Sequence, residues 1–226
     1  KTALGLLGQG QLSLCKVVVL LDAHVDPQDF SAVLREGFKH FDPREDVLLL
    51  PGTTQDTLDF TSFAMNLGSK LILDFTSSRG PLPAPRSAQP KTRAKKPKPT
   101  GRFEPTSLKR ILGKAYLGHK SLQDMLLVVK VETGGAGASQ ALAALLLKAK
   151  LGPHKMLAVV SPDVDLDDPS SLIWGLFTRF DAARDLQFSK ATLHQAWPVY
   201  EGVLGLDATW KQGYPDPVEM PAEIVA

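Results

Sequence analysis

Two apolar runs, at 17–21 and 156–160, are each followed by a polar loop and then by an amphipathic segment. Continuous apolar runs are typical of strands that are covered on both faces, and the following segments repeat at the period of a helix. Asp29 and Asp168 stand where a helix N-cap is favoured, and Pro169 follows at the first helical position. The pattern predicts an α/β fold with mainly parallel sheets flanked by helices.

Further apolar runs predict additional strands at 46–50, 70–73 and 125–131. The last run precedes a glycine-rich turn and a predicted helix over 138–150. Strands that alternate with helices in this way favour βαβ units.

Two segments of the chain resemble each other at a constant spacing of 139 residues. The positions that keep their residue type are Leu6, Leu7, Leu12, Lys16, Val25, Asp26, Asp29, Ser31, Phe38, Phe41, Asp42 and Asp46. Further on, Leu73 and Asp74 align with Leu206 and Asp207 once a loop is shortened by six residues. A register kept through a strand and two helices predicts two related α/β units from an internal duplication.

The predicted units are 1–78 and 104–226, the second with an extended C-terminal tail, and a linker over 79–103 separates them. From Arg79 to Arg102 the linker has eight basic residues, six prolines and no acidic residue, while the rest of the chain is acidic. Such a segment cannot bury enough apolar surface to fold alone. A basic arm could bind nucleic acid, but this one lacks aromatic residues for stacking, so we expect no nucleic-acid partner.

The second unit has a strand at 125–131 that the first unit lacks. In the first unit the matching helix begins at about Lys1, so the matching strand would lie before the start of this sequence. We therefore expect the first unit to be truncated at its N-terminus.

The glycine-rich turn is one candidate binding site. Gly134, Gly135 and Gly137 lie between a predicted strand and a helix, where backbone N–H groups and the helix dipole can hold a phosphate. Lys148 is a candidate second phosphate contact. This arrangement would make a Rossmann-like nucleotide-binding module, although the spacing is not that of the dinucleotide fingerprint. A tight turn packed against a neighbour explains the glycines equally well.

Other candidate chemistry is weaker. Asp22, His24 and Asp26 follow a strand in a pattern that could ligate a metal, but helix-capping and loop acids are the favoured interpretation, so we predict no metal site. Cys15 has no partner in a CxxC motif, and we expect it to be a packed thiol. One cysteine excludes an internal disulfide, and no apolar run reaches membrane-spanning length. We expect a cytoplasmic protein without an integral membrane segment.

Three stretches of the first unit carry a family resemblance: 8–26, 42–46 and 68–74. Together they resemble the C-terminal part of the UbiD family, and the second unit repeats the pattern. The resemblance implies a carboxy-lyase that uses prenylated flavin mononucleotide to decarboxylate an aromatic or unsaturated acid in ubiquinone or menaquinone biosynthesis. An additional C-terminal unit resembles the menaquinone type of the futalosine route.

The resemblance also implies where the chemistry lies. Prenylated FMN and its Mn²⁺ are expected in a preceding flavin-binding domain, and no catalytic residue of the family can be carried onto this sequence. The chain would then be inactive alone, with its own flavin domain and further copies of itself as partners, and would support oligomerisation and the pocket. Two alternatives remain open: the nucleotide-binding module and a ligand-free interaction domain.

Overall fold

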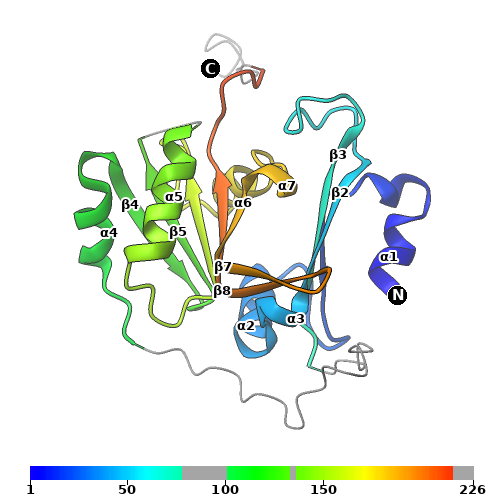
Figure 1. Ribbon diagram of the computed structural model, residues 1–226, viewed down its shortest axis with the longest axis horizontal. Helices are drawn as coiled ribbons and strands as arrows, with labels where there is room; N and C mark the ends of the chain where they lie inside the picture. The colour runs from blue at the N-terminus through cyan, green and yellow to red at the C-terminus, as the bar shows by residue number, and fades with distance from the viewer. Residues whose placement is uncertain (78–100, 133–135, 216–226) are drawn as a thin grey trace, which may run out of the picture.

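The computed structural model describes residues 1–77, 101–132 and 136–215. Within these ranges two β-sheets lie side by side, with α1 (Thr2–Leu7) outside one sheet and α4 (Pro105–Leu112) and α5 (Ala136–Lys148) outside the other (Figure 1). No helix in the described part of the chain is long and apolar enough to cross a membrane.

The smaller sheet belongs to the first unit and has the order β1-β3-β2. Its strands are β1 (Val17–Leu20), β2 (Val47–Thr54) and β3 (Leu67–Asp74). The central strand β3 pairs in parallel with β1 and antiparallel with β2. Between β1 and β2 the chain forms α2 (Phe30–His40) and the short α3 (Pro43–Asp46), and a 3₁₀ helix, η1 (Gly10–Leu14), precedes β1.

The larger sheet belongs to the second unit and has the order β4-β5-β6-β8-β7. Its strands are β4 (Tyr116–Leu122), β5 (Leu126–Val131), β6 (Met156–Val160), β7 (Leu186–His194) and β8 (Trp197–Ala208). The remaining helices are the 3₁₀ helix η2 (Gly113–Ala115), α6 (Pro169–Phe177) and α7 (Ala182–Asp185). The pairs β5/β6 and β6/β8 are parallel, whereas β4/β5 and β7/β8 are antiparallel.

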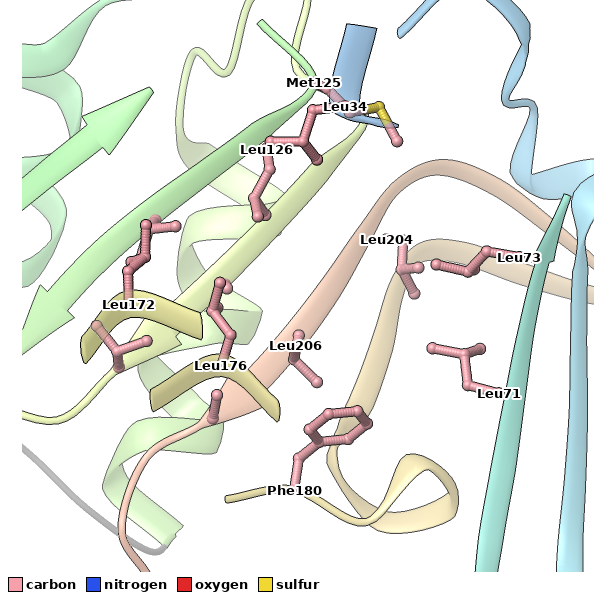
Figure 2. Close-up of a cluster of buried hydrophobic side chains, with 14 of the residues drawn as sticks. Leu34, Leu71, Leu73, Met125, Leu126, Leu172, Leu176, Phe180, Leu204 and Leu206 are labelled. Carbon is pink, nitrogen blue, oxygen red and sulfur yellow. The ribbon is translucent and has the colours of Figure 1, made fainter. Parts of the chain in front are cut away.

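Three layers of apolar side chains hold these elements together. An outer layer packs α1 on the small sheet through Ala3, Leu7 and Ile72, and another packs α4 and α5 on β5 and β6. The middle layer lies between the sheets, where Leu71 and Leu73 of β3 face Leu204 and Leu206 of β8 (Figure 2). Because successive strand residues point to opposite faces, β3 contributes to both layers that touch it.

The two units pack on each other reciprocally. The short helix α3 lies on β8 of the second unit, and its counterpart α7 lies on β3 of the first. Lys16 Nζ lies 5.0 Å from the ring centroid of Phe180, while its counterpart Lys155 donates a hydrogen bond to the carbonyl of Phe41. Since Phe41 and Phe180 are themselves counterparts, the contact resembles the self-complementary interface of a twofold dimer.

The predicted helix starts are confirmed. Asp29 accepts a hydrogen bond from the Ala32 amide, and Asp168 accepts from the amides of Ser170 and Ser171. The helix predicted at 138–150 begins two residues earlier, at Ala136.

The expectation of mainly parallel sheets needs correction, because both sheets are mixed. A short loop joins β7 to β8 and another joins β4 to β5, and short loops produce antiparallel pairs. The small sheet gains its antiparallel pair through the longer loop between β2 and β3. Most of the predicted linker, 79–103, lies outside the described residues, so the domain boundaries stay a prediction.

Candidate functional site

The glycine turn is only partly described. Gly134 and Gly135 lie outside the described residues, and Gly137 is in the first turn of α5. Lys148 is the last residue of the same helix, eleven positions later. At a rise of about 1.5 Å per residue the two are roughly 16 Å apart along the axis, so Lys148 lies at the opposite end from the predicted phosphate. The phosphate site itself stays a prediction.

The loop after β1 uses its acids for backbone contacts. Asp22 Oδ2 accepts a hydrogen bond from the Ser77 amide, and Asp26 Oδ1 accepts from the Gln28 amide. The contact with Ser77 lowers the pKa of Asp22. His24 is exposed, and no group of three or more metal-ligating side chains occurs within the described ranges.

The second unit keeps the contact that Asp22 makes, although its residue type differs. Ser161 Oγ, 139 positions later, accepts a hydrogen bond from the Trp210 amide at 2.6 Å. Trp210 follows β8 as Ser77 follows β3. A short polar side chain at this position therefore ties the end of one strand to the loop after its neighbour in both units.

The expectation of a packed thiol at Cys15 was wrong, because this residue is exposed. It follows the 3₁₀ helix η1 and precedes β1, outside the layers of the core. A lone exposed thiol without a described partner is no evidence of a nucleophile.

A group of charged and aromatic side chains lies beyond the carboxyl end of β8, with Asp185, Asp207 and Lys211 buried and Arg184 exposed. We call it the Tyr214 cluster; its members are Arg179, Arg184, Asp185, Asp207, Lys211 and Tyr214. It lies where open α/β sheets usually place their ligands, at the carboxyl ends of parallel strands.

Arg184 connects this cluster to the first unit. Its guanidinium donates to both carboxylate oxygens of Asp185, at 2.8 and 2.6 Å, and to the hydroxyl of Tyr214 at 2.7 Å. It also donates to the carbonyl of Thr61, in the loop between β2 and β3, at 2.7 Å. Bidentate pairing fixes both side chains in one geometry.

Lys211 is almost fully enclosed by acceptors. Its ammonium donates to the carbonyls of Arg179, Asp207 and Thr209 at 3.0–3.2 Å. It also lies 3.4 Å from Asp207 Oδ1 and 3.5 Å from Asp185 Oδ2. Burial lowers the pKa of Lys211, while the two carboxylates act in the opposite direction. The ammonium is thus held by the fold and is not presented to a ligand.

Aromatic rings complete the cluster on its outer side. Tyr214 packs edge-on against Phe60 at 4.9 Å, and Phe63 lies 5.3 Å from the same ring. The guanidinium of Arg184 lies 4.9 Å from the centroid of the Phe63 ring. Burial raises the pKa of the Tyr214 hydroxyl, which donates to the carbonyl of Arg179. The loop 55–66 is therefore anchored to the second unit by edge-on and tilted ring contacts and by the guanidinium of Arg184.

The role that the Tyr214 cluster can serve is to hold the loop 55–66 in position. Arg184 pairs with Asp185 and Lys211 lies beside Asp207, while Arg179 pairs with Asp163 outside the cluster. The hydroxyl of Tyr214 donates to the carbonyl of Arg179. The sequence comparison between the units missed the cluster, because the position of Arg184 is a glutamate in the first unit and Tyr214 lies beyond the repeated stretch. Asp185 and Asp207 were visible as repeated residues, but their partners were not.

A second polar group surrounds the ring of Phe103. His119 and His154 both pack edge-on against it, and the Tyr116 hydroxyl lies 2.6 Å from His119 Nδ1. Burial, with a smaller contribution from the neighbouring His154, lowers the pKa of His119. His119 is therefore favoured in its neutral form.

His154 contacts a serine hydroxyl, which the sequence did not indicate. Its Nδ1 lies 2.6 Å from the Leu151 carbonyl, so the proton belongs on Nδ1 and Nε2 accepts from Ser121 Oγ at 2.7 Å. A nucleophilic serine needs such a base, but it also needs donors for the developing oxyanion. We interpret the contact as a tie between β4 and the loop before β6.

One open depression, of about 440 Å³, lies between α2 and the turn that joins β4 to β5. It is lined by Arg35, Phe38, Lys39, Ser121, Gln123 and Asp124. Arg35 pairs with Asp29 and Lys39 pairs with Glu36, so its cations already have partners. The depression marks a contact between the two units.

Comparison with protein families gives one match that covers most of the chain. Residues 1–75 and 114–206 match the family described as the 3-octaprenyl-4-hydroxybenzoate carboxy-lyase C-terminal domain, UbiD_C. The match includes both units and omits the segment between them.

Three proteins from Chlamydia species match almost the whole chain. An uncharacterized protein of Chlamydia caviae is 31% identical over 229 residues, which are 96% of this chain and 33% of that protein. A 4-hydroxybenzoate decarboxylase subunit of Chlamydia pneumoniae is 42% identical over 71 residues, 31% of this chain and 12% of that protein. The chain spans about a third of the length of the relatives that it matches end to end.

Solved structures give partial matches. The UbiD-class enzyme HmfF from Pelotomaculum thermopropionicum, in an evolved dimeric form with prFMN, is 17% identical with a TM-score of 0.39. This match covers 54% of this chain and 26% of that one. Vanillic acid decarboxylase from Sedimentibacter hydroxybenzoicus is 27% identical with a TM-score of 0.34, over 39% of this chain and 20% of that one.

Proposed function

The chain belongs to the family of UbiD carboxy-lyases, whose C-terminal domain it matches, and from this premise we propose that it supports the active site and the oligomer of a decarboxylase. The proposed substrate is an aromatic or unsaturated acid of quinone biosynthesis, ubiquinone or menaquinone. The family match over both units is the observation that carries the proposal.

The cofactor would be held elsewhere in the full-length protein. The described residues contain no group of three metal-ligating side chains, and the charged side chains of the Tyr214 cluster are paired within the protein. These residues do not fit the binding of Mn²⁺ or of a flavin phosphate, so we derive no catalytic step from them. We infer that prenylated FMN is bound by a preceding domain and that this chain holds that domain in place.

The loop 55–66 is the surface that we assign to this contact. It exposes large apolar side chains, among them Leu58 (88% exposed), Phe63 and Met65. The Tyr214 cluster anchors its backbone through Arg184 and Thr61. An exposed apolar surface on an anchored loop is suited to docking, because little conformational freedom is lost on binding.

We also infer that the two units arose by internal duplication. Their elements follow in the same order, and β1-β3-β2 has the same pairing directions as β6-β8-β7. The reciprocal packing of α3 and α7 is what a fused dimer would retain.

The test compares three proteins: the full-length chain, the 226-residue chain, and the full-length chain without these residues. We expect flavin content and carbon dioxide release from the full-length protein only, because catalysis requires the cofactor and the acid to be held in one geometry. Stoichiometric flavin binding by the 226-residue chain would contradict the proposal.

A matched pair of variants tests the docking loop in the full-length protein. Leu58→Asp should reduce flavin retention and decarboxylation by about tenfold or more, since a charge would be buried at the contact. Leu147→Asp, at an exposed leucine of α5, is the control and should leave both unchanged. Equal activity of the two variants would show that the loop 55–66 is not part of the contact.

A further inference from the structure

Strand β1 has one edge without a neighbouring strand in the described chain, whereas both edges of its counterpart β6 are paired. Within the described chain β1 pairs with β3 alone, whereas β6 lies between β8 and β5. Residues 17–20 are all apolar, without the charge, proline or bulge that usually protects an edge strand. An edge of this kind is a template for a further strand.

Helix α6 has an uncovered apolar face. Ile173, Trp174 and Phe177 are all exposed, Trp174 to 68%. Phe177 lies four positions after Ile173 and three after Trp174, so it neighbours both side chains on the helix surface. Single exposed apolar residues are ordinary, but three together on one face indicate a contact.

The corresponding face of α2 is partly covered: Leu34 is buried and Phe38 is half-buried, while Arg35 is exposed. Leu34, the counterpart of Ile173, is buried in the middle layer together with Met125 (Figure 2). Ser121, Gln123 and Asp124 line a depression with residues of α2. The turn that leads into β5 of the second unit therefore covers α2 of the first.

The open edge of β1 and the exposed face of α6 correspond to two surfaces that one segment of the second unit covers. In the second unit, the segment that consists of β5 and the turn before it makes two contacts. Strand β5 pairs with β6, and the turn packs on α2. The same segment in the first unit would pair with β1 and cover α6. Because α1 corresponds to the part of α5 that lies 139 residues later, that segment would precede α1 in the polypeptide.

We propose that a β-strand of the polypeptide preceding Lys1 pairs in parallel with β1, and that the turn before this strand packs on Ile173, Trp174 and Phe177. The strand should be a short apolar run like β5, joined to α1 by a brief connection. The much greater length of the relatives leaves room for such a segment. The inference rests on the proposed duplication and not on the proposed decarboxylase activity.

Hydrogen exchange tests the strand without any substitution. Peptides that contain β1 are compared in the full-length protein and in the 226-residue chain. We expect the β1 amides to exchange at least about tenfold more slowly in the full-length protein, because the open edge becomes paired. Equal exchange in the two proteins would overturn the proposal. Protection that appears in the shorter chain only as its concentration rises would assign the edge to a second copy and would also overturn it.

A substitution tests the turn. Trp174→Asp should speed the exchange of β1 by about tenfold in the full-length protein and should leave the 226-residue chain unchanged. Leu147→Asp is the control, because Leu147 is at least as exposed as Trp174 but lies on α5, outside the proposed contact. An equal effect of Trp174→Asp in both proteins would mean that the side chain acts within this chain, against the proposal.

Discussion

The first and second units use the same elements in the same order, but they bury them differently. Strand β6 has four of its five residues buried, whereas all four residues of β1 are only partly buried. The two sequences are similarly apolar, so composition does not explain the difference. Burial follows from the neighbours, because β6 has a strand on each side and β1 has one.

The turns that follow β3 and β8 also differ in their surroundings. Asp74 accepts hydrogen bonds from the amide and hydroxyl of Thr76, and Asp207 accepts the same pair from Thr209. Only Asp207 also lies beside a buried ammonium, that of Lys211. The same turn motif therefore ends both strands, and the charged cluster lies beside it in the unit that anchors loop 55–66.

Large effects of similar size are expected from both matched phenylalanines of the middle layer. Phe41→Ala and Phe180→Ala should each lower the free energy of unfolding by about 3–5 kcal/mol, since both rings are almost completely buried. Chemical denaturation with two spectroscopic probes should give one transition for each variant, because both units contribute to this layer. A second transition in Phe41→Ala alone would show that the first unit unfolds independently.

Substitution of the two matched aspartates should lower the free energy of unfolding by different amounts. Asp207→Asn should lower the free energy of unfolding by about 3–5 kcal/mol, because it removes a carboxylate from a buried ion pair. Asp74→Asn should cost only about 1 kcal/mol, as for the loss of a capping contact. Urea titration of both variants measures the difference. Equal losses would mean that the Tyr214 cluster adds nothing to the shared turn.

The smallest effect concerns His119 in β4, a strand without a described counterpart in the first unit. Because its pKa is lowered in the folded protein, the unfolded chain takes up this proton first as the pH falls. The contribution of His119 is complete above its ordinary pKa of about 6.5 and is lost as the pH falls through the lowered value. The free energy of unfolding of His119→Gln should therefore depend less on pH below 6.5 than that of the parent, as measured by urea titration across this range.

The exposed His194 on β7 supplies the control for this titration. His194→Gln should leave the acid dependence of the parent unchanged. A His119→Gln variant with the same acid slope as the parent would assign the loss of stability to other groups.

The local features of the fold could be predicted from the sequence, because their causes are local. An aspartate before an apolar periodic segment caps a helix wherever that segment packs, and both Asp29 and Asp168 do so. The strand positions followed from the apolar runs for the same reason. The strand directions did not follow, because they depend on which loops the chain closes into short turns.

The Tyr214 cluster could not be predicted, because its partners are far apart in the sequence. Arg184 meets Thr61 across 123 residues, and Tyr214 meets Phe60 through the packing of one unit on the other. The contact between Ser121 and His154 likewise joins residues 33 positions apart. Spacing within one segment carries no signal of such pairs.

The central claim is that the two units form one cooperative structure around the middle layer. Native-state hydrogen exchange of β3 and β8 amides in increasing denaturant tests it most directly. We predict that both sets exchange only through global unfolding, with the same free energy and the same denaturant dependence. Exchange of the β3 amides through a lower-energy opening, while β8 stays protected, would contradict the account.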